Sequence, residues 1–272
     1  MFPSSIRLPD AAPRVALVTG AGHRIGRVIA LALAARGWDV AVHYGNSGDA
    51  AATVAAEIDA LGRRAVALKA DLADEAQVAT LLPQIAELLG PVTCIVNNAS
   101  LFEEDSATDF NYRTLQRLTA VNLAAPLALA RALYQSLPPE ADEDENLRGV
   151  VINLLDQKLF NQNPDFLSYT LTKAALHTAT TTLAQALAPR VRVVGVAPGL
   201  TMPSGDQTPA DFAQAHRRTP LRRASHPQDV AAAVCYLAEA PAVTGTTLLV
   251  DGGQHLLPLP RDVMFMTGTS ST

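Results

Sequence analysis

Short apolar runs alternate along the chain with longer amphipathic runs. The apolar runs are dense in Val, Leu and Ile and show no alternation of polar with apolar positions. This pattern is typical of strands that are buried on both faces, as in a parallel sheet. Seven strands are predicted, at 15–20, 39–44, 65–70, 93–98, 149–155, 191–196 and 246–252.

The amphipathic runs between these strands have the periodicity of helices. Regular alternation of strand and helix predicts right-handed βαβ units. We therefore expect an α/β fold with a Rossmann-type, doubly wound parallel sheet of seven strands and helices on both faces, in three αβα layers. The helices are predicted at about 23–36, 48–61, 74–89, 109–137, 166–188 and 227–239.

The segments outside this pattern define the domain organisation. A single Rossmann-type domain is expected at 14–254. Residues 1–13 carry Pro and charged residues without an apolar run before a cleavage site, which predicts a flexible N-terminal arm and no secretory signal. The Pro-rich, charged segment 198–228 follows a strand and is predicted to be a substrate loop or lid. Residues 255–272 form a C-terminal tail.

Composition narrows the class of protein. Of the 272 residues 49% are apolar, and the net charge of −5 argues against a nucleic-acid partner, which needs a basic face. No apolar run approaches the ~20 residues of a spanning helix, so we expect no membrane partner and a cytoplasmic location. Cys94 and Cys235 lie in apolar runs and the six histidines lack ligand spacing, so no disulfide and no metal site are predicted.

A glycine-rich turn joins the first predicted strand to the first helix. Gly20, Gly22 and Gly26 follow the pattern T-G-x-G-x-x-x-G. Glycines in such a turn let the backbone approach a pyrophosphate, and the helix N-terminus offers free N–H groups. The turn therefore predicts a dinucleotide site, the alternative being an ordinary strand–helix connection.

The end of the second strand indicates which dinucleotide binds. An acidic residue there would bind the adenosine ribose of NAD and repel a 2′-phosphate, but no carboxylate occurs before Asp49. Asn46 and Ser47 can donate hydrogen bonds to a phosphate, and Arg24 can supply charge. We predict NADPH, although no basic residue directly follows the strand.

Tyr169 and Lys173 lie four residues apart on a predicted helix and so share one face. A free Tyr has a pKa near 10, and a neighbouring cation stabilises the phenolate and lowers that pKa. Lys173 is therefore predicted to tune Tyr169 for proton transfer. Two other polar positions are ambiguous: Asp71 either ends a turn or contacts the cofactor's adenine end, and Asn122 either faces solvent or distorts its helix.

The motifs "TGAGHRIG", "NNAS", "YTLTK", "VAPGL" and "LLVDGG" together resemble the short-chain dehydrogenase/reductase family from about 14 to 254. The resemblance implies a nicotinamide cofactor and a catalytic Asn–Ser–Tyr–Lys set, which falls on Asn122, Asp156, Tyr169 and Lys173. Three positions match, and the Ser position holds Asp156. The cofactor contacts that the resemblance and the turn imply are Gly20, Gly22, His23, Arg24, Ile25, Gly26, His43, Asn46, Ser47, Asp71, Leu72, Asn98, Ala99, Ser100, Tyr169, Lys173, Pro198 and Gly199.

The departure at Asp156, together with Arg24 and Phe102, resembles the pteridine reductase branch, including dihydromonapterin-type reductases. In that branch the Phe stacks on the pterin and the Asp and Tyr handle the proton. An ionised Asp accepts from ring N–H groups, and it can donate if burial raises its pKa. The implied substrate residues are Arg24, Ser100, Phe102, Asp156 and Tyr169.

The leading hypothesis is an NADPH-dependent reductase that transfers hydride to the C=N bond of a dihydropterin-like substrate. Asn122 would then hold a water relay. The alternatives are a general carbonyl or 3-oxoacyl reductase of the same family, and a nucleotide-binding protein that has lost catalysis. The family resemblance also implies a homo-oligomer, a tetramer or dimer, formed through the helices at 109–137 and 166–188, and the tail could dock on a neighbouring subunit.

Overall fold

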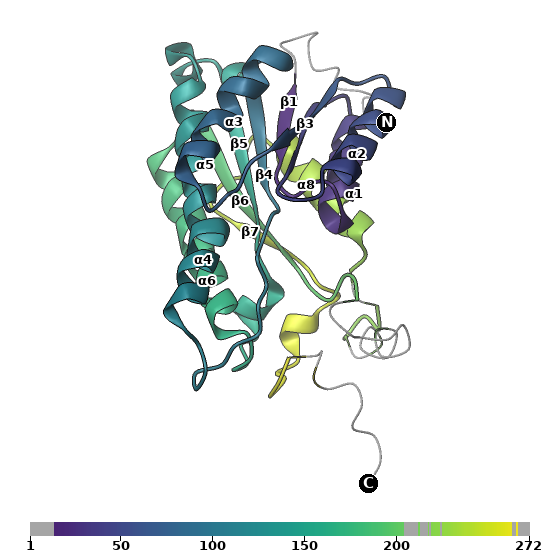
Figure 1. Ribbon diagram of the computed structural model, residues 1–272, viewed down its shortest axis with the longest axis vertical. Helices are drawn as coiled ribbons and strands as arrows, with labels where there is room; N and C mark the ends of the chain where they lie inside the picture. The colour runs from purple at the N-terminus through teal and green to yellow at the C-terminus, as the bar shows by residue number, and fades with distance from the viewer. Residues whose placement is uncertain are drawn as a thin grey trace, which may run out of the picture.

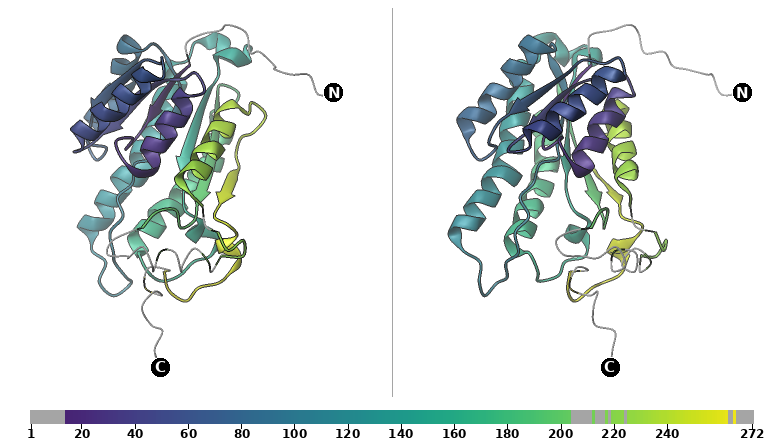
Figure 2. Two further views of the ribbon diagram at one scale, coloured as in Figure 1. Left: turned by 90° about the vertical axis from the view of Figure 1, so that its right-hand side faces the viewer. Right: turned by 45° about the vertical axis from the view of Figure 1, so that its right-hand side comes forward.

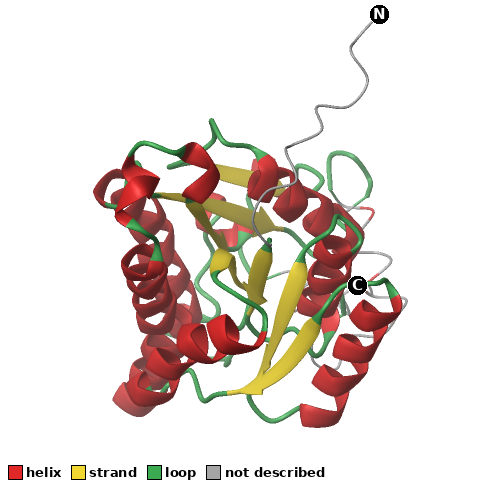
Figure 3. Ribbon diagram, turned by 90° about the horizontal axis from the view of Figure 1, so that it is seen from above, coloured by secondary structure: helices red, strands yellow, loops and turns green. Residues whose placement is uncertain are grey.

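The computed structural model consists of one parallel sheet between two layers of helices (Figures 1 and 3). It describes residues 14–203, 219–223 and 225–262, together with residues 212, 217 and 265. The predicted N-terminal arm lies outside the described residues, as do parts of the predicted lid and tail.

The sheet has seven strands in the order β3-β2-β1-β4-β5-β6-β7, and every neighbouring pair is parallel. The prediction of a doubly wound, seven-stranded sheet is therefore confirmed. The order reverses between β1 and β4, and in such sheets ligands bind beyond the carboxyl ends of the strands at this reversal. The strands are β1 (Val15–Val18), β2 (Asp39–Tyr44), β3 (Ala65–Lys69), β4 (Val92–Asn97), β5 (Gly149–Leu154), β6 (Val191–Pro198) and β7 (Thr247–Val250).

Helices cover both faces of the sheet, as the two further views also show (Figure 2). Ala16 and Val18 of β1 belong to the core cluster beneath α1, α2 and α8, whereas Val15 and Leu17 belong to the cluster beneath α3 and α5. Successive strand residues point to opposite faces, so only a strand that is apolar throughout can contribute to both clusters. One face carries α1 (Arg24–Ala34), α2 (Gly48–Ala60) and α8 (Pro227–Glu239), and the other carries α3 (Glu75–Leu88), α4 (Tyr112–Thr119), α5 (Ala125–Ser136) and α6 (Leu167–Ala186).

The single helix predicted at 109–137 is divided in the structure. A π-helical turn, Ala120–Ala124, separates α4 from α5. Asn122 lies in this turn, and its amide accepts a hydrogen bond from the Leu101 N–H at 2.8 Å and donates to the Leu101 carbonyl at 2.9 Å. A π-turn of this kind is frequent at functional sites. The predicted assembly through these helices stays a prediction.

The described part of the tail packs on its own chain, beside the start of α6. The Arg261 Nε contacts both carboxylate oxygens of Asp165, at 2.8 and 2.9 Å. The backbone N–H of Asp262 donates to the same carboxylate, and the Phe265 ring stacks 5.7 Å from that of Phe166. Among the helices of the described residues, none is long and apolar enough to cross a membrane.

Candidate active site

The glycine-rich turn between β1 and α1 is held rigidly by its neighbours. A Cβ at Gly26 would lie 2.4 Å from the Gly20 carbonyl oxygen and 2.5 Å from Asn98 Nδ2, so no larger residue fits there without a shift. Asn98 donates from Nδ2 to the carbonyls of Thr19 and Gly20, at 2.9 and 3.2 Å. Asn98, which directly follows β4, therefore helps to hold the shape of the turn.

The ring of His43 is buried and bonded to protein on both sides. The Gly20 N–H donates to Nδ1 at 3.1 Å, and Nε2 lies 3.1 Å from the Ala70 carbonyl, so the proton must be on Nε2. Burial lowers the pKa of this imidazole, which stays neutral. The His43 ring therefore anchors the glycine turn, and the predicted contact of His43 with the cofactor stays a prediction.

The turn after β2 lies against the glycine loop. A Cβ at Gly22 would come within 3.3 Å of the Ala51 backbone nitrogen and 3.5 Å of the Ser47 carbonyl oxygen. Asn46 is exposed beside this contact. Asp71, which the sequence left ambiguous, serves its own turn, because its Oδ1 accepts from the Ala73 N–H at 2.9 Å.

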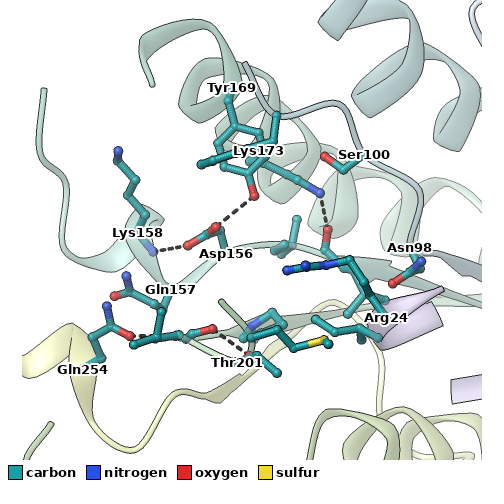
Figure 4. A pocket seen from close by; sticks show the side chains of 18 of the residues that line it. Arg24, Asn98, Ser100, Asp156, Gln157, Lys158, Tyr169, Lys173, Thr201 and Gln254 are labelled. Carbon is teal, nitrogen blue, oxygen red and sulfur yellow. Dashed lines mark hydrogen bonds between the residues drawn. The ribbon is translucent and has the colours of Figure 1, made fainter. Parts of the chain in front are cut away.

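A cavity of about 500 Å³ opens at the carboxyl ends of the strands (Figure 4). The predicted residues that line it are Arg24, Ile25, Asn98, Ser100, Phe102, Asp156, Tyr169, Lys173, Pro198 and Gly199. Predicted residues that are not part of its lining are Gly20, Gly22, His23, Gly26, His43, Asn46, Ser47, Asp71, Leu72, Ala99 and Asn122. The structure thus brings the predicted reacting groups together.

Asp156, Tyr169 and Lys173 form the centre of the cavity. Asp156 follows β5 and caps the short 3-10 turn Gln157–Phe160, where its Oδ1 accepts from the Lys158 N–H at 2.8 Å. The Tyr169 hydroxyl, on α6, donates to Asp156 Oδ2 at 2.9 Å. Lys173 lies one turn further along α6, and its Nζ donates to the Leu154 carbonyl at 2.7 Å. Tyr169 and Asp156 are therefore directly hydrogen-bonded.

Burial of this centre favours the uncharged forms of Asp156, Tyr169 and Lys173. Burial raises the pKa of Asp156. Burial and the Asp156 carboxylate raise the pKa of Tyr169 well above its ordinary value. Burial lowers the pKa of Lys173 to about 8. We predicted a lowered pKa for Tyr169, and its net pKa is raised instead, because desolvation and the facing carboxylate both disfavour the phenolate.

Phe102 forms one wall of the cavity and is 45% exposed. Its ring stacks on Phe166 with the centroids 4.2 Å apart, and it meets the Tyr169 ring edge-on at 4.7 Å. Phe166 belongs to the segment on which the tail residue Phe265 also stacks. The aromatic wall is therefore held in place beside the reacting phenol.

Arg24 and Asn122 support the site from its edges. Both terminal nitrogens of Arg24 lie 3.1 Å from the Pro203 carbonyl, which ties the glycine turn to the segment after β6. Asn122 binds the backbone of Leu101 and donates to Thr172 Oγ1 at 3.1 Å, between Tyr169 and Lys173 on α6. The predicted water relay at Asn122 stays a prediction.

Several residues that line the cavity were not predicted from the sequence. Gln157 and Lys158 directly follow Asp156 at the end of a strand, a position where ligand contacts are common, so the signal was present. Gln254 and Asp262 come from beyond the last strand and carried no motif. The lining residues that were not predicted individually are Leu154, Leu155, Gln157, Lys158, Leu200, Thr201, Met202, Gln254 and Asp262.

Comparison with known proteins identifies relatives along nearly the whole chain. A family model described as enoyl-(acyl carrier protein) reductase matches residues 20–255. L-rhamnose 1-dehydrogenase (NAD(P)(+)) of a Sphingomonas species is 32% identical over 89% of this chain and 96% of its own length. The 3-oxoacyl-[acyl-carrier-protein] reductase of a Synechocystis species is 34% identical over 88% of this chain and 96% of its own length.

Among solved structures, FolM alternative dihydrofolate reductase 1 from Brucella canis, complexed with NADP, is similar to this chain throughout. It is 40% identical, and the match covers 92% of this chain and 96% of that one with a TM-score of 0.85.

Proposed function

The chain belongs to the short-chain dehydrogenase/reductase family and is an NAD(P)-dependent oxidoreductase, and on this premise we propose that it reduces a C=N bond of a dihydropterin with NADPH. The observation that carries the proposal is the 2.9 Å hydrogen bond from the Tyr169 hydroxyl to Asp156, in a cavity walled by Phe102. The 40% identity to a protein described as an alternative dihydrofolate reductase supports it.

The residues present suit a bound dinucleotide. The compact glycine turn leads into the N-terminus of α1, whose free N–H groups favour a pyrophosphate. Lys173 and Ser100 line the cavity and offer hydrogen-bond donors for a ribose. When bound, the nicotinamide cofactor supplies the hydride, and the remaining task of the protein is to hold the substrate and deliver a proton.

Proton delivery to a ring nitrogen draws on two protons, one on the Tyr169 hydroxyl and one on the Asp156 carboxyl, whose raised pKa favours its protonated form. Tyr169 gives its proton to the nitrogen as that atom gains electron density. A phenolate is unfavourable here, so the Asp156 carboxyl passes its own proton to the phenolate and becomes a carboxylate, which later regains a proton from solvent. The Lys173 ammonium, one helical turn away, stabilises the negative charge while it lasts. The same pair also orients a ring N–H donor, which a ketone lacks.

The rate of reduction is expected to fall as the pH rises through about 8. Lys173 has a pKa lowered to about 8 by burial, so above this pH it loses the charge that offsets the transient phenolate. Loss of the Asp156 proton, as the pH rises through its raised pKa, acts in the same direction. A profile of kcat/KM against pH, with dihydropterin and saturating NADPH, measures this. A rate that rises through pH 8 would contradict the assigned roles.

The second candidate is a carbonyl or 3-oxoacyl reductase, which the similarity to a 3-oxoacyl-[acyl-carrier-protein] reductase favours. Asp156 opposes it, because it stands where the family pattern has a Ser, the residue that donates a hydrogen bond to a carbonyl oxygen. A non-catalytic binding protein is opposed by the hydrogen-bonded arrangement of Tyr169, Asp156 and Lys173.

We expect NADPH oxidation with at least one dihydropterin and a kcat/KM for NADPH at least tenfold above that for NADH. The preference follows from the turn after β2, where Asn46 and Ser47 lie beside the glycine loop and no carboxylate occurs before Asp49. The assay follows absorbance of the reduced cofactor with dihydrobiopterin, dihydromonapterin, dihydrofolate and simple ketones. Turnover of ketones without any dihydropterin would replace the proposal by the second candidate.

A further inference from the structure

Gln157 is one of the residues that line the cavity, and no described residue hydrogen-bonds its carboxamide. The residue directly follows Asp156 and is only 8% exposed. Within the described residues its side chain makes no hydrogen bond, and its Oε1 is fully buried without a donor. Buried amide oxygens in proteins are nearly always paired, and an exception calls for an explanation such as a missing ligand contact.

A second glutamine of the cavity, Gln254, does have a protein partner. Gln254 Oε1 accepts from the Leu200 N–H at 2.9 Å, and it fits against Gly199, where an added Cβ would lie 2.8 Å away. Its amide therefore holds the segment that follows β6. The Gln157 carboxamide makes no hydrogen bond to the described residues, so it does not hold any of these segments in place.

The neighbouring charged groups are already engaged. The Lys158 ammonium donates to the Asp165 carbonyl and lies 3.5 Å from the Asp262 carboxylate. Asp156 is bonded to Tyr169 and to the Lys158 N–H. Figure 4 shows Gln157 on the side of Asp156 that lies away from Arg24, Asn98 and Ser100. The Gln157 carboxamide there has no hydrogen bond among the described residues and can bind a ligand.

We propose that Gln157 is a specificity-determining residue that pairs with the lactam edge of the substrate, an inference that rests on the dihydropterin reduction proposed above. A carboxamide presents a donor and an acceptor side by side. Since neither end is anchored, rotation of the terminal amide can present its oxygen or its NH2 to the cavity. A lactam offers the complementary N–H beside C=O, whereas a 3-oxoacyl chain offers acceptors only.

The test replaces Gln157 by Met, which keeps the length and removes both polar groups. We expect kcat/KM for dihydropterin to fall at least tenfold, mainly through KM, because a site built to bond an N–H loses its partner. The dissociation constant for NADPH and the midpoint of thermal unfolding should not worsen, since the removed oxygen had no partner in the fold. The matched control Gln254→Met should instead lower the unfolding midpoint, because the Leu200 N–H loses its acceptor.

A comparison of two substrates distinguishes a loss of substrate recognition from a general loss of activity. The wild-type protein should prefer dihydropterin over its N3-methyl derivative, which lacks the ring N–H, by at least tenfold, and Gln157→Met should lose this preference. Equal activity of Gln157→Met and wild type on dihydropterin, or an equal loss on both substrates, would overturn the inference while leaving the proposed function intact. A wild-type protein that reduces no dihydropterin would instead overturn the proposed function, and the inference with it.

Discussion

Replacing Tyr169 by Phe is expected to lower kcat for dihydropterin reduction by about 10²- to 10⁴-fold, the range that a positioned proton donor contributes. The phenol is the group that donates to Asp156 at 2.9 Å, and it lies edge-on to the Phe102 ring at the wall of the cavity. Phe keeps the ring and therefore this packing. The fall should appear in single-turnover rates with saturating NADPH, which report on chemistry and not on product release.

The control for this variant is Tyr236→Phe. Tyr236 is 56% exposed, lies on α8 and is not one of the residues that line the cavity, so its hydroxyl should not affect turnover. Titration of NADPH fluorescence should give similar dissociation constants for both variants. A Tyr169→Phe protein that retains more than a tenth of the wild-type rate would show that the proton reaches the substrate by another route.

Replacing Asp156 by Asn is expected to lower the rate of dihydropterin reduction by about 10²-fold and to raise the stability at neutral pH. Asn is nearly isosteric and can still accept from the Lys158 N–H, but it cannot return a proton to Tyr169. The activity loss therefore isolates proton transfer from the shape of the turn. Rates measured from pH 5 to 9 should also show a weaker pH dependence than those of the wild type.

The expected gain in stability follows from the direction of the pKa shift. Burial raises the pKa of Asp156 in the folded protein, so folding favours its protonated form. The stability that comes from this group is present at low pH and is lost as the pH rises through the raised pKa. A neutral Asn avoids that loss, so its unfolding midpoint should exceed the wild-type value at pH 8 more than at pH 5.

The control variant is Asp59→Asn. Asp59 is exposed on α2, and among the described residues its carboxylate has no hydrogen bond or ion pair. An Asp156→Asn protein with full dihydropterin activity would refute the role of the carboxyl in proton transfer. If that variant instead gains ketone turnover, the carboxylate acts by excluding carbonyl substrates.

The sequence by itself determined the architecture and the chemistry of the central residues. The strands were visible because both faces of a parallel sheet are buried, which leaves runs without polar positions. The glycine turn was visible because close backbone contact tolerates no Cβ, as the 2.4 Å approach at Gly26 shows. Tyr169 and Lys173 were visible because residues four apart share a helix face, and Asp156 because it stands at a recognised position of the family pattern.

Only the tertiary structure decided how these groups affect one another. The direction of the Tyr169 pKa depends on burial and on a carboxylate 13 residues away, and neither can be measured along the chain. The sequence did not show that both ring nitrogens of His43 hydrogen-bond to protein backbone. The position of Gln157 after a strand was visible in the sequence, but the absence of a partner for its buried amide oxygen was not. Burial and pairing are properties of three-dimensional packing, and a sequence pattern records them only where they recur with the period of a helix or a strand.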